Sequence, residues 1–229
     1  IEQGLSQGMV NDIAEDQTGF LWVATKEGLN RYDGTGFRVF RHIPDNPYSL
    51  ADNFTYSLEV DTNNRVWVTT QSNGVDLFDP KSETFHHFRR DSLNPNAISS
   101  NQTGILLKDH NQNILVETLD EEGFAVITEE RGETKTDFLF RPITEVYPSL
   151  LPFKTGKDWT KHLVFGSDKS IWYYDLDSVY HITGDLYSTD AQVDAFYIAP
   201  RIFRGGKDAT VFIPSKNKSE LYITDNEQT

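Results

Sequence analysis

Apolar and polar residues alternate over short distances along this chain, and the pattern predicts strands rather than helices. Residues 9–16, 19–25, 29–33 and 36–42 are four segments rich in β-branched and aromatic side chains. Short turns that contain Asp, Asn or Gly separate these segments, and such residues favour tight reversals of the backbone. We therefore predict a small sheet of four strands over the first forty or so residues.

The second of these predicted strands, GFLWVAT, is apolar on both faces. Phe20 and Trp22 fall on one face, and Leu21 and Val23 fall on the other. A sheet with one face in water would alternate apolar with polar residues instead. We therefore expect another sheet on each side of this one.

The same pattern recurs along the sequence. Trp22 is followed 45 residues later by Trp67, and further steps of 48, 48 and 49 residues lead to Leu115, Leu163 and Phe212; we call these five positions the anchors. Three aspartates stand six residues before the first three anchors: Asp16, Asp61 and Asp109. The segments NPYSLADN (46–53) and NPNAISSN (94–101) also match at an offset of 48.

A four-stranded sheet that repeats every 45–50 residues, covered by its neighbours on both faces, is typical of a β-propeller blade. The fold class is therefore all-β, with about five blades in one propeller fragment over residues 1–229. The expected repeats are residues 4–48, 49–96, 97–144, 145–193 and 194–229, the last of them incomplete. Pro148 and Pro152 stand where the first strand of the fourth repeat is expected. We expect the chain to be the front part of a longer protein.

Composition excludes several classes of function. The chain has 35 acidic and 21 basic residues and a formal charge of −14, which disfavours both nucleic acid and an anionic membrane surface as partners. No apolar run approaches the roughly 20 residues that span a bilayer. The absence of cysteine excludes disulfides and thiolate chemistry. The six histidines show no metal-ligand spacing, so neither a metal nor a cofactor is expected.

The repeated aspartates allow two interpretations. Paired carboxylates are the machinery of glycosidases. Asp16, Asp61 and Asp109, however, recur at the same turn of successive blades, and blade geometry would separate them. Turn capping is therefore the favoured interpretation. The aspartates that close the third predicted strand of a repeat are interpreted in the same way: Asp33, Asp79, Asp175 and Asp225.

Candidate ligand contacts follow from position in the blade. Ligands of propellers usually meet the end where the loop into the first strand and the turn between the second and third strands emerge. The candidates at this end are polar residues that suit sugar hydroxyls, with two aromatic residues as platforms: Asn53, Asn101, Gln71, Asn73, Lys26, Tyr56 and Trp159. For Asn53 and Asn101, which occupy equivalent positions, loop capping is the favoured alternative.

The segment GLSQGMVNDIAEDQTGFLWVATKEGLNRYDGTGFRVF resembles the propeller repeats of the periplasmic sensor regions of bacterial hybrid two-component regulators of the Bacteroides type. The resemblance rests on an aspartate turn, a strand around the tryptophan, and a Gly-Leu-x-Arg-Tyr-Asp element. It is specific over residues 4–128. It departs at Leu115 and Thr128 and is weak beyond them.

The resemblance implies a role outside the cytoplasm. Members of this family carry seven-bladed propellers, detect oligosaccharides in the periplasm, and control polysaccharide-utilisation genes through a histidine kinase elsewhere in the same membrane-anchored protein. It implies three partners for this segment: an oligosaccharide, the rest of its own sensor region and a second copy. We therefore expect a non-enzymatic sensor fragment. The alternatives are a propeller enzyme, either a glycoside hydrolase or a lyase, and a protein-interaction scaffold.

Overall fold

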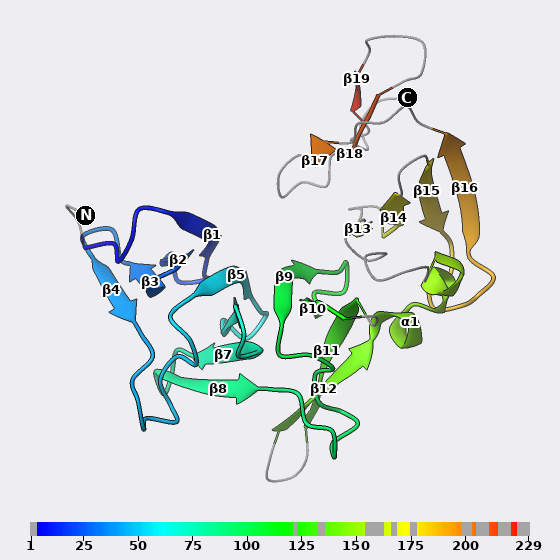
Figure 1. Cartoon of the computed structure of the whole chain (residues 1–229). Helices are drawn as coiled ribbons and strands as arrows, with labels where there is room; N and C mark the ends of the chain where they lie inside the picture. Colours follow the sequence, from blue (N-terminus) through cyan, green and yellow to red (C-terminus); the bar gives the residue numbers. More distant parts are fainter. Residues whose placement is uncertain are drawn as a thin grey trace. The chain divides into compact units, whose positions relative to one another are not determined.

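The computed structural model describes residues 4–120, 123–131, 136–153, 163–165, 169–174, 178–197, 203–204, 211–214 and 221–223 (Figure 1). The chain divides into two compact units, Ile1–Pro142 and Ile143–Thr229. Each unit is described by itself below.

The first unit contains three antiparallel sheets of four strands, and the strand order in each sheet follows the chain. The first sheet has β1 (Val10–Glu15), β2 (Leu21–Thr25), β3 (Gly28–Tyr32) and β4 (Phe37–Phe40). The second has β5 (Thr55–Val60), β6 (Val66–Thr70), β7 (Val75–Asp79) and β8 (Thr84–Phe88). The third has β9 (Thr103–Lys108), β10 (Ile114–Thr118), β11 (Phe124–Arg131) and β12 (Thr136–Pro142). The first strands β1, β5 and β9 lie side by side, and β4, β8 and β12 lie on the outer side (Figure 1).

The second unit begins with a short helix, α1 (Ile143–Val146), and a 3-10 turn, η1 (Pro148–Phe153). A fourth antiparallel sheet follows, with β13 (Leu163–Phe165), β14 (Ile171–Tyr174), β15 (Ser178–Thr183) and β16 (Gln192–Tyr197). A last sheet has β17 (Phe203–Arg204), β18 (Val211–Pro214) and β19 (Leu221–Ile223). The sequence prediction of an all-β fold built from repeated four-stranded propeller blades is confirmed.

The fourth sheet departs from the predicted register. Leu163 was expected on a second strand, but it lies on β13, which forms one edge of its sheet in the described part of the chain. The described residues that precede it, 143–153, form α1 and η1 instead of a strand. Pro148 and Pro152 explain this, because proline cannot donate to the hydrogen-bond ladder of a sheet. Phe212 lies on β18, the middle strand of its sheet.

Trp22 packs between the first and second sheets. It is fully buried and belongs to a core cluster that joins residues of the first sheet to Leu58, Val66 and Phe78 of the second. The centres of the Trp22 and Phe78 rings are 5.0 Å apart. The first anchor therefore packs against the neighbouring blade, as close inter-sheet packing of apolar faces requires.

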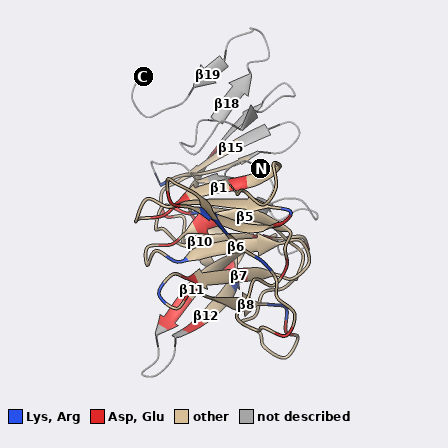
Figure 2. Cartoon of the chain, turned by 90° about the vertical axis from the view of Figure 1, so that its left-hand side faces the viewer, with Lys and Arg blue, Asp and Glu red and all other residues tan. Residues whose placement is uncertain are grey.

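Trp67 repeats this arrangement one blade further on. Its cluster joins it to Leu106, Ile114 and Val116 of the third sheet, and its ring centre is 5.3 Å from that of Phe138. All five residues of β6 are buried, because this strand has a neighbouring sheet on each side. Figure 2 shows that β6 carries no charged residue. The charged residues of the other strands and loops lie mainly at strand ends and in loops.

Threonine side chains join neighbouring blades at equivalent positions. The Thr55 hydroxyl donates to the Thr25 carbonyl at 2.9 Å and accepts from the Thr25 N–H at 2.9 Å. One repeat later, the Thr103 hydroxyl donates to the Thr70 carbonyl at 3.2 Å. These bonds satisfy backbone groups at the buried ends of the second strands.

Gly74 offers a sharp test of this packing. Its φ of +72° lies in the left-handed region, and a Cβ there would overlap the carbonyl oxygen of Phe88. Gly74→Ala is expected to lower the free energy of unfolding by more than about 2 kcal/mol, because backbone strain and steric overlap add. Gly34→Ala is the matched control, since Gly34 also has a positive φ but an added Cβ would meet nothing within 4 Å. Urea denaturation measures both; equal losses at the two positions would contradict the close approach at Gly74.

Candidate functional site

The repeated aspartates organise the turn between the first and second strands of each blade. Oδ1 of Asp61 accepts hydrogen bonds from the backbone N–H groups of Asn63 and Arg65, each at 2.9 Å. Oδ2 accepts from Arg65 Nε at 2.7 Å and from the indole Nε1 of Trp67 at 3.1 Å. The aspartate therefore fixes its turn and holds the anchor tryptophan through the same carboxylate.

Asp16 does the same in the first blade. It accepts from the N–H and hydroxyl of Thr18, the N–H of Phe20 and the indole of Trp22, the last at 2.8 Å. Burial raises the pKa of Asp16, but the hydrogen bonds from Thr18, Trp22 and Phe20 outweigh it and hold that pKa below its ordinary value. Asp33 caps a second kind of turn, and hydrogen bonds from Thr35 and Gly36 lower its pKa to about 2.

The third blade keeps the aspartate without the tryptophan. Leu115 takes the anchor position, so no indole is present to donate. Asn113 replaces it, because its side-chain amide donates to Oδ2 of Asp109 at 2.8 Å. The backbone N–H groups of Asn111 and Asn113 donate to Oδ1 at 2.8 Å each, as in the other two turns.

The candidate ligand contacts in the first unit gather at the opposite end of the blades from these aspartate turns. The loops that enter β5 and β9 hydrogen-bond to the turns after β2 and β6, through Gly28 N–H to Asn53 O and Gly74 N–H to Asn101 O. Lys26 and Gln71 are exposed there, and Lys26 Nζ lies 5.2 Å from the centre of the Phe54 ring.

The remaining candidates divide between the loops and the strands. Tyr56 is exposed on β5. The amide of Asn73 donates to a carboxylate oxygen of Asp52 at 3.4 Å. Trp159 lies outside the described residues, as do Asp175 and Asp225 of the repeat pattern.

Asn53 and Asn101 use their side chains to hold loops. Oδ1 of Asn53 accepts from the N–H of His42 at 2.8 Å, and Oδ1 of Asn101 accepts from the N–H of Arg90 at 2.7 Å. Both bonds tie the loop before a blade to the end of the outer strand of the preceding blade. These equivalent contacts support the loop-capping alternative for the two residues.

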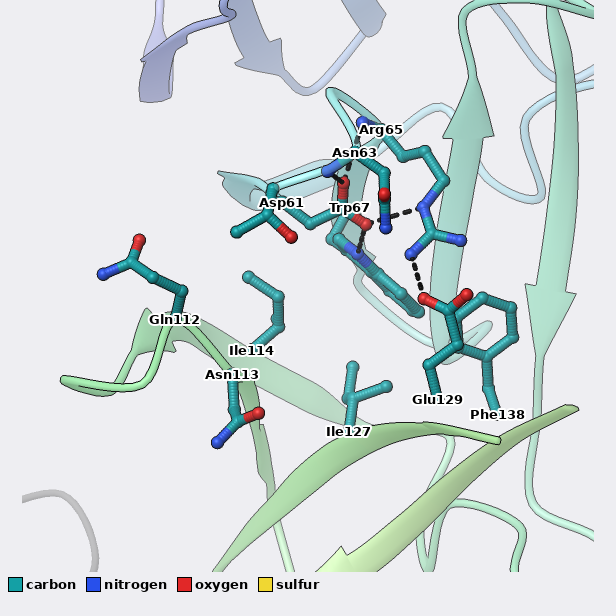
Figure 3. Close-up of a pocket in the computed structure, with 11 residues that line it drawn as sticks. Asp61, Asn63, Arg65, Trp67, Gln112, Asn113, Ile114, Ile127, Glu129 and Phe138 are labelled. Atoms are coloured by element: carbon teal, nitrogen blue, oxygen red, sulfur yellow. Dashed lines mark hydrogen bonds and ion pairs between the residues drawn. The ribbon is translucent and has the colours of Figure 1, made fainter. Parts of the chain in front are cut away.

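A pocket of about 120 Å³ lies between the second and third sheets, beside the aspartate turns (Figure 3). One wall comes from the turn before β6 and from β6 itself, and the other comes from β10, β11, β12 and the turn before β10. The lining residues are Asp61, Thr62, Asn63, Arg65, Trp67, Gln112, Asn113, Ile114, Ile127, Glu129 and Phe138. The ligand contacts predicted in the first unit lie at the other end of the blades, so this pocket was not predicted from the sequence.

Arg65 closes one side of the pocket. Its guanidinium pairs with Asp61 at 2.7 Å and with Glu129 at 2.8 Å, and it lies 5.1 Å from the centre of the Phe138 ring (Figure 3). Burial lowers the pKa of Arg65, but the hydrogen bonds to Glu129 and Asp61 outweigh it and raise that pKa. The arginine therefore stays charged and links two neighbouring blades.

A difference between repeats accounts for the open space. Between the first two blades, the Gln17 side chain donates to the carbonyls of Asp61 and Thr62, each at 3.2 Å, and its N–H donates to Asn64 Oδ1 at 2.7 Å. One repeat later, Thr62 takes the place of Gln17 and its side chain is too short to span the junction. The presence of Thr62 where the preceding repeat has Gln17 is the sequence signal that could have indicated the pocket.

A second polar cluster joins the second blade to its incoming loop. Asp76 is fully buried on β7, where Oδ2 accepts from the Ala51 N–H at 2.7 Å. Its Oδ1 lies 2.7 Å from Nδ1 of His87, whose Nε2 lies 2.9 Å from the Pro47 carbonyl oxygen. Both partners of the imidazole can only accept, so both ring nitrogens donate in the protonated ring.

This cluster predicts a dependence of stability on pH. The hydrogen bond to Asp76 raises the pKa of His87 above 6.5, although burial and Arg89 oppose it. The stabilisation is therefore fully present below pH 6.5 and is lost as the pH rises through the raised pKa. We expect the free energy of unfolding to fall above pH 6.5 in the wild type and to fall less in His87→Gln. His86→Gln is the matched control, because His86 is exposed on the same strand; urea denaturation from pH 5.5 to 9 measures all three. An unchanged pH profile in His87→Gln would contradict this.

Within the residues that the structure describes, no group of three His, Asp or Glu side chains is placed to hold a metal ion. The described helices are too short to cross a membrane.

Comparisons with known proteins agree with the fold. Residues 4–27 match the family model of the two component regulator propeller. A segment of 48 residues, 21% of this chain and 4% of the relative, is 46% identical to histidine kinase P4 of Formosa agariphila. The chain thus spans a small part of that relative.

Solved structures are similar in fold over almost the whole chain. The extracellular domain of a protein assigned as a hybrid two component system, from B. thetaiotaomicron, matches 99% of this chain and 30% of its own length, with a TM-score of 0.67 and 19% identity. A second extracellular domain from that organism, assigned to a one component system, matches 97% of this chain and 28% of its own length, with a TM-score of 0.62 and 20% identity. Virginiamycin B lyase from Staphylococcus aureus matches all of this chain and 72% of its own length, with a TM-score of 0.52 and 12% identity. Residues 4–27 therefore match a two-component regulator propeller repeat, and the chain has the β-propeller fold seen in the extracellular domains of hybrid two-component systems.

Proposed function

We propose that this chain is part of the ligand-sensing region of a membrane-anchored hybrid two-component regulator. The observation that carries the proposal is the match of residues 4–27 to the two-component regulator propeller, together with the recurrence of the same turn and anchor in the next blade. The rest of the parent protein, which we propose to contain the histidine kinase, would lie outside this segment. The segment itself would bind ligand and catalyse no reaction.

The proposed ligand is an oligosaccharide from the breakdown of a polysaccharide. Carboxamide side chains line the pocket, and Lys26, Tyr56 and Gln71 are exposed at the other end of the blades. Carboxamides both donate and accept hydrogen bonds, as recognition of sugar hydroxyls requires. These two ends are the candidate contact surfaces.

The signal would be a shift between two arrangements of paired sensor regions. A ligand moves such an equilibrium only by its difference in affinity for the two arrangements. We propose that the region lies in the periplasm, that the parent is anchored in the inner membrane, and that a second copy is the partner in signalling. The regulated genes would be those for use of the same polysaccharide.

Isothermal titration of the complete extracytoplasmic region against a panel of oligosaccharides tests this proposal. We expect one structural group of oligosaccharides to bind and to remain chemically intact, as judged by mass spectrometry after the titration. Failure of the whole panel to bind would overturn the sensing role. Cleavage of the bound sugar would instead indicate a propeller enzyme.

A further inference from the structure

We propose that the pocket between the second and third blades binds one ring of a neutral sugar, a proposal that rests on the sensing function above. This site lies beside the aspartate turns, at the opposite end of the blades from Lys26 and Gln71. Asn63 and Gln112 would contact the sugar hydroxyls, and the walls of Ile114 and Ile127 would contact its C–H groups.

The size of the pocket sets the size of the bound part. A volume of about 120 Å³ holds several water molecules, because one water needs only about 10–15 Å³ of such space. One sugar ring, or part of one, therefore enters, and the remainder of an oligosaccharide stays outside. A sugar that enters must replace the hydrogen bonds of the water it displaces.

The rim supplies groups to replace those bonds. In the described part of the chain, the side-chain amides of Asn63 and Gln112 make no hydrogen bond, and both residues are exposed. Each carboxamide offers two N–H donors and one carbonyl acceptor. Figure 3 shows the two residues on different walls, Asn63 on the turn before β6 and Gln112 on the turn before β10. They could therefore hold one ring from both sides.

Charge selects a neutral ligand. The charged residues of the lining are Asp61, Glu129 and Arg65, which sum to a formal charge of −1. The arginine is already paired with both carboxylates, so its guanidinium is engaged within the protein. An anion would meet a negative pocket in a chain of formal charge −14. A cation would have to compete with Arg65 for the two carboxylates.

The neighbouring junction suggests the decisive variant. Gln17 spans the junction between the first two blades, and Thr62 is its counterpart between the second and third. Thr62→Gln should extend a carboxamide across the pocket in the same way. It should therefore block the ligand while preserving the packing of the blades.

The experiment is calorimetric titration of the complete extracytoplasmic region with neutral oligosaccharides of glucose, mannose, galactose and xylose. Spermidine and a sulfated disaccharide serve as cationic and anionic probes. For the oligosaccharide that binds the wild type, we expect Thr62→Gln to raise Kd at least about tenfold and Gln112→Ala to raise it about threefold to tenfold, the range of one lost hydrogen bond. Leu93→Ala, whose side chain is 92% exposed and does not line the pocket, should leave Kd unchanged.

The controls separate this proposal from the sensing function. Thermal unfolding checks that Thr62→Gln remains folded; if it does not, Gln112→Ala decides alone, because its side chain is exposed and makes no hydrogen bond in the described structure. An oligosaccharide that binds both variants as tightly as the wild type would overturn the site but leave the sensing role intact. Binding of only spermidine or only the sulfated sugar would overturn the neutral ligand. If no sugar binds the wild type, the sensing proposal fails and this one fails with it.

Discussion

Replacing Trp67 by alanine is expected to lower the free energy of unfolding by about 3–5 kcal/mol, the usual cost of truncating a buried aromatic side chain. Trp67 is 1% exposed, and its ring packs against Phe88 and Phe138. The truncation would leave a cavity between two blades and remove the indole that donates to Asp61. Urea denaturation of the wild type and the variant measures the loss.

Two further variants provide comparisons for the Trp67→Ala result. Trp67→Leu imitates the third repeat, where Leu115 occupies the anchor, and should cost less than Trp67→Ala because it refills part of the cavity. Leu93→Ala is the surface control, since Leu93 is 92% exposed, and should change stability by no more than about 0.5 kcal/mol. A Trp67→Ala protein as stable as the Leu93→Ala protein would refute the proposed position of the anchor between blades.

Asp61→Ala has the second largest expected effect, a loss of about 3 kcal/mol. The substitution removes the acceptor of the Asn63 and Arg65 N–H groups and of the Trp67 indole. It also breaks the ion pair with the half-buried Arg65. Buried donors left without an acceptor, and a charge left without its partner, account for the size of the loss.

Asp33→Ala is the matched control for Asp61→Ala. Asp33 also accepts several hydrogen bonds within a turn, from Thr35 and Gly36, but it is exposed to solvent. Water can replace its bonds after truncation, so a clearly smaller loss is expected by the same denaturation measurement. Equal losses would show that burial of the Asp61 turn contributes little.

The architecture of the first unit could be predicted from sequence because its signals are local and repeated. Three local signals recur in successive blades, and each is compatible with one local structure. They are a strand with Trp22 or Trp67 at its centre, a turn closed by Asp16 or Asp61, and a glycine before the third strand. Repetition at a near-constant spacing then indicated that the sheets pack on one another. The short helical segment before β13 could not be derived in the same way. The repeat spacing of 48 residues predicts a strand there, but it does not show what the chain forms where proline excludes that strand.

The candidate site was harder to predict, since residue type alone does not show what a polar side chain binds. Asn53 and Asn101 suit sugar recognition by residue type, but the structure uses both for backbone hydrogen bonds. The pocket depends on a shortened side chain, Thr62 in place of Gln17, and on a long-range pair between Arg65 and Glu129. No local pattern reveals contacts between residues 64 positions apart in the chain.

The stacking of neighbouring blades is tested most directly by a nuclear Overhauser effect between the indole of Trp22 and the ring of Phe78, measured with only Trp and Phe protonated. A strong cross-peak is expected, because the ring centres are 5.0 Å apart across two different sheets. The same cross-peak should vanish in Phe78→Leu, which assigns it. A Trp22 indole with contacts only inside its own sheet would contradict the stacking of blades on which every other inference depends.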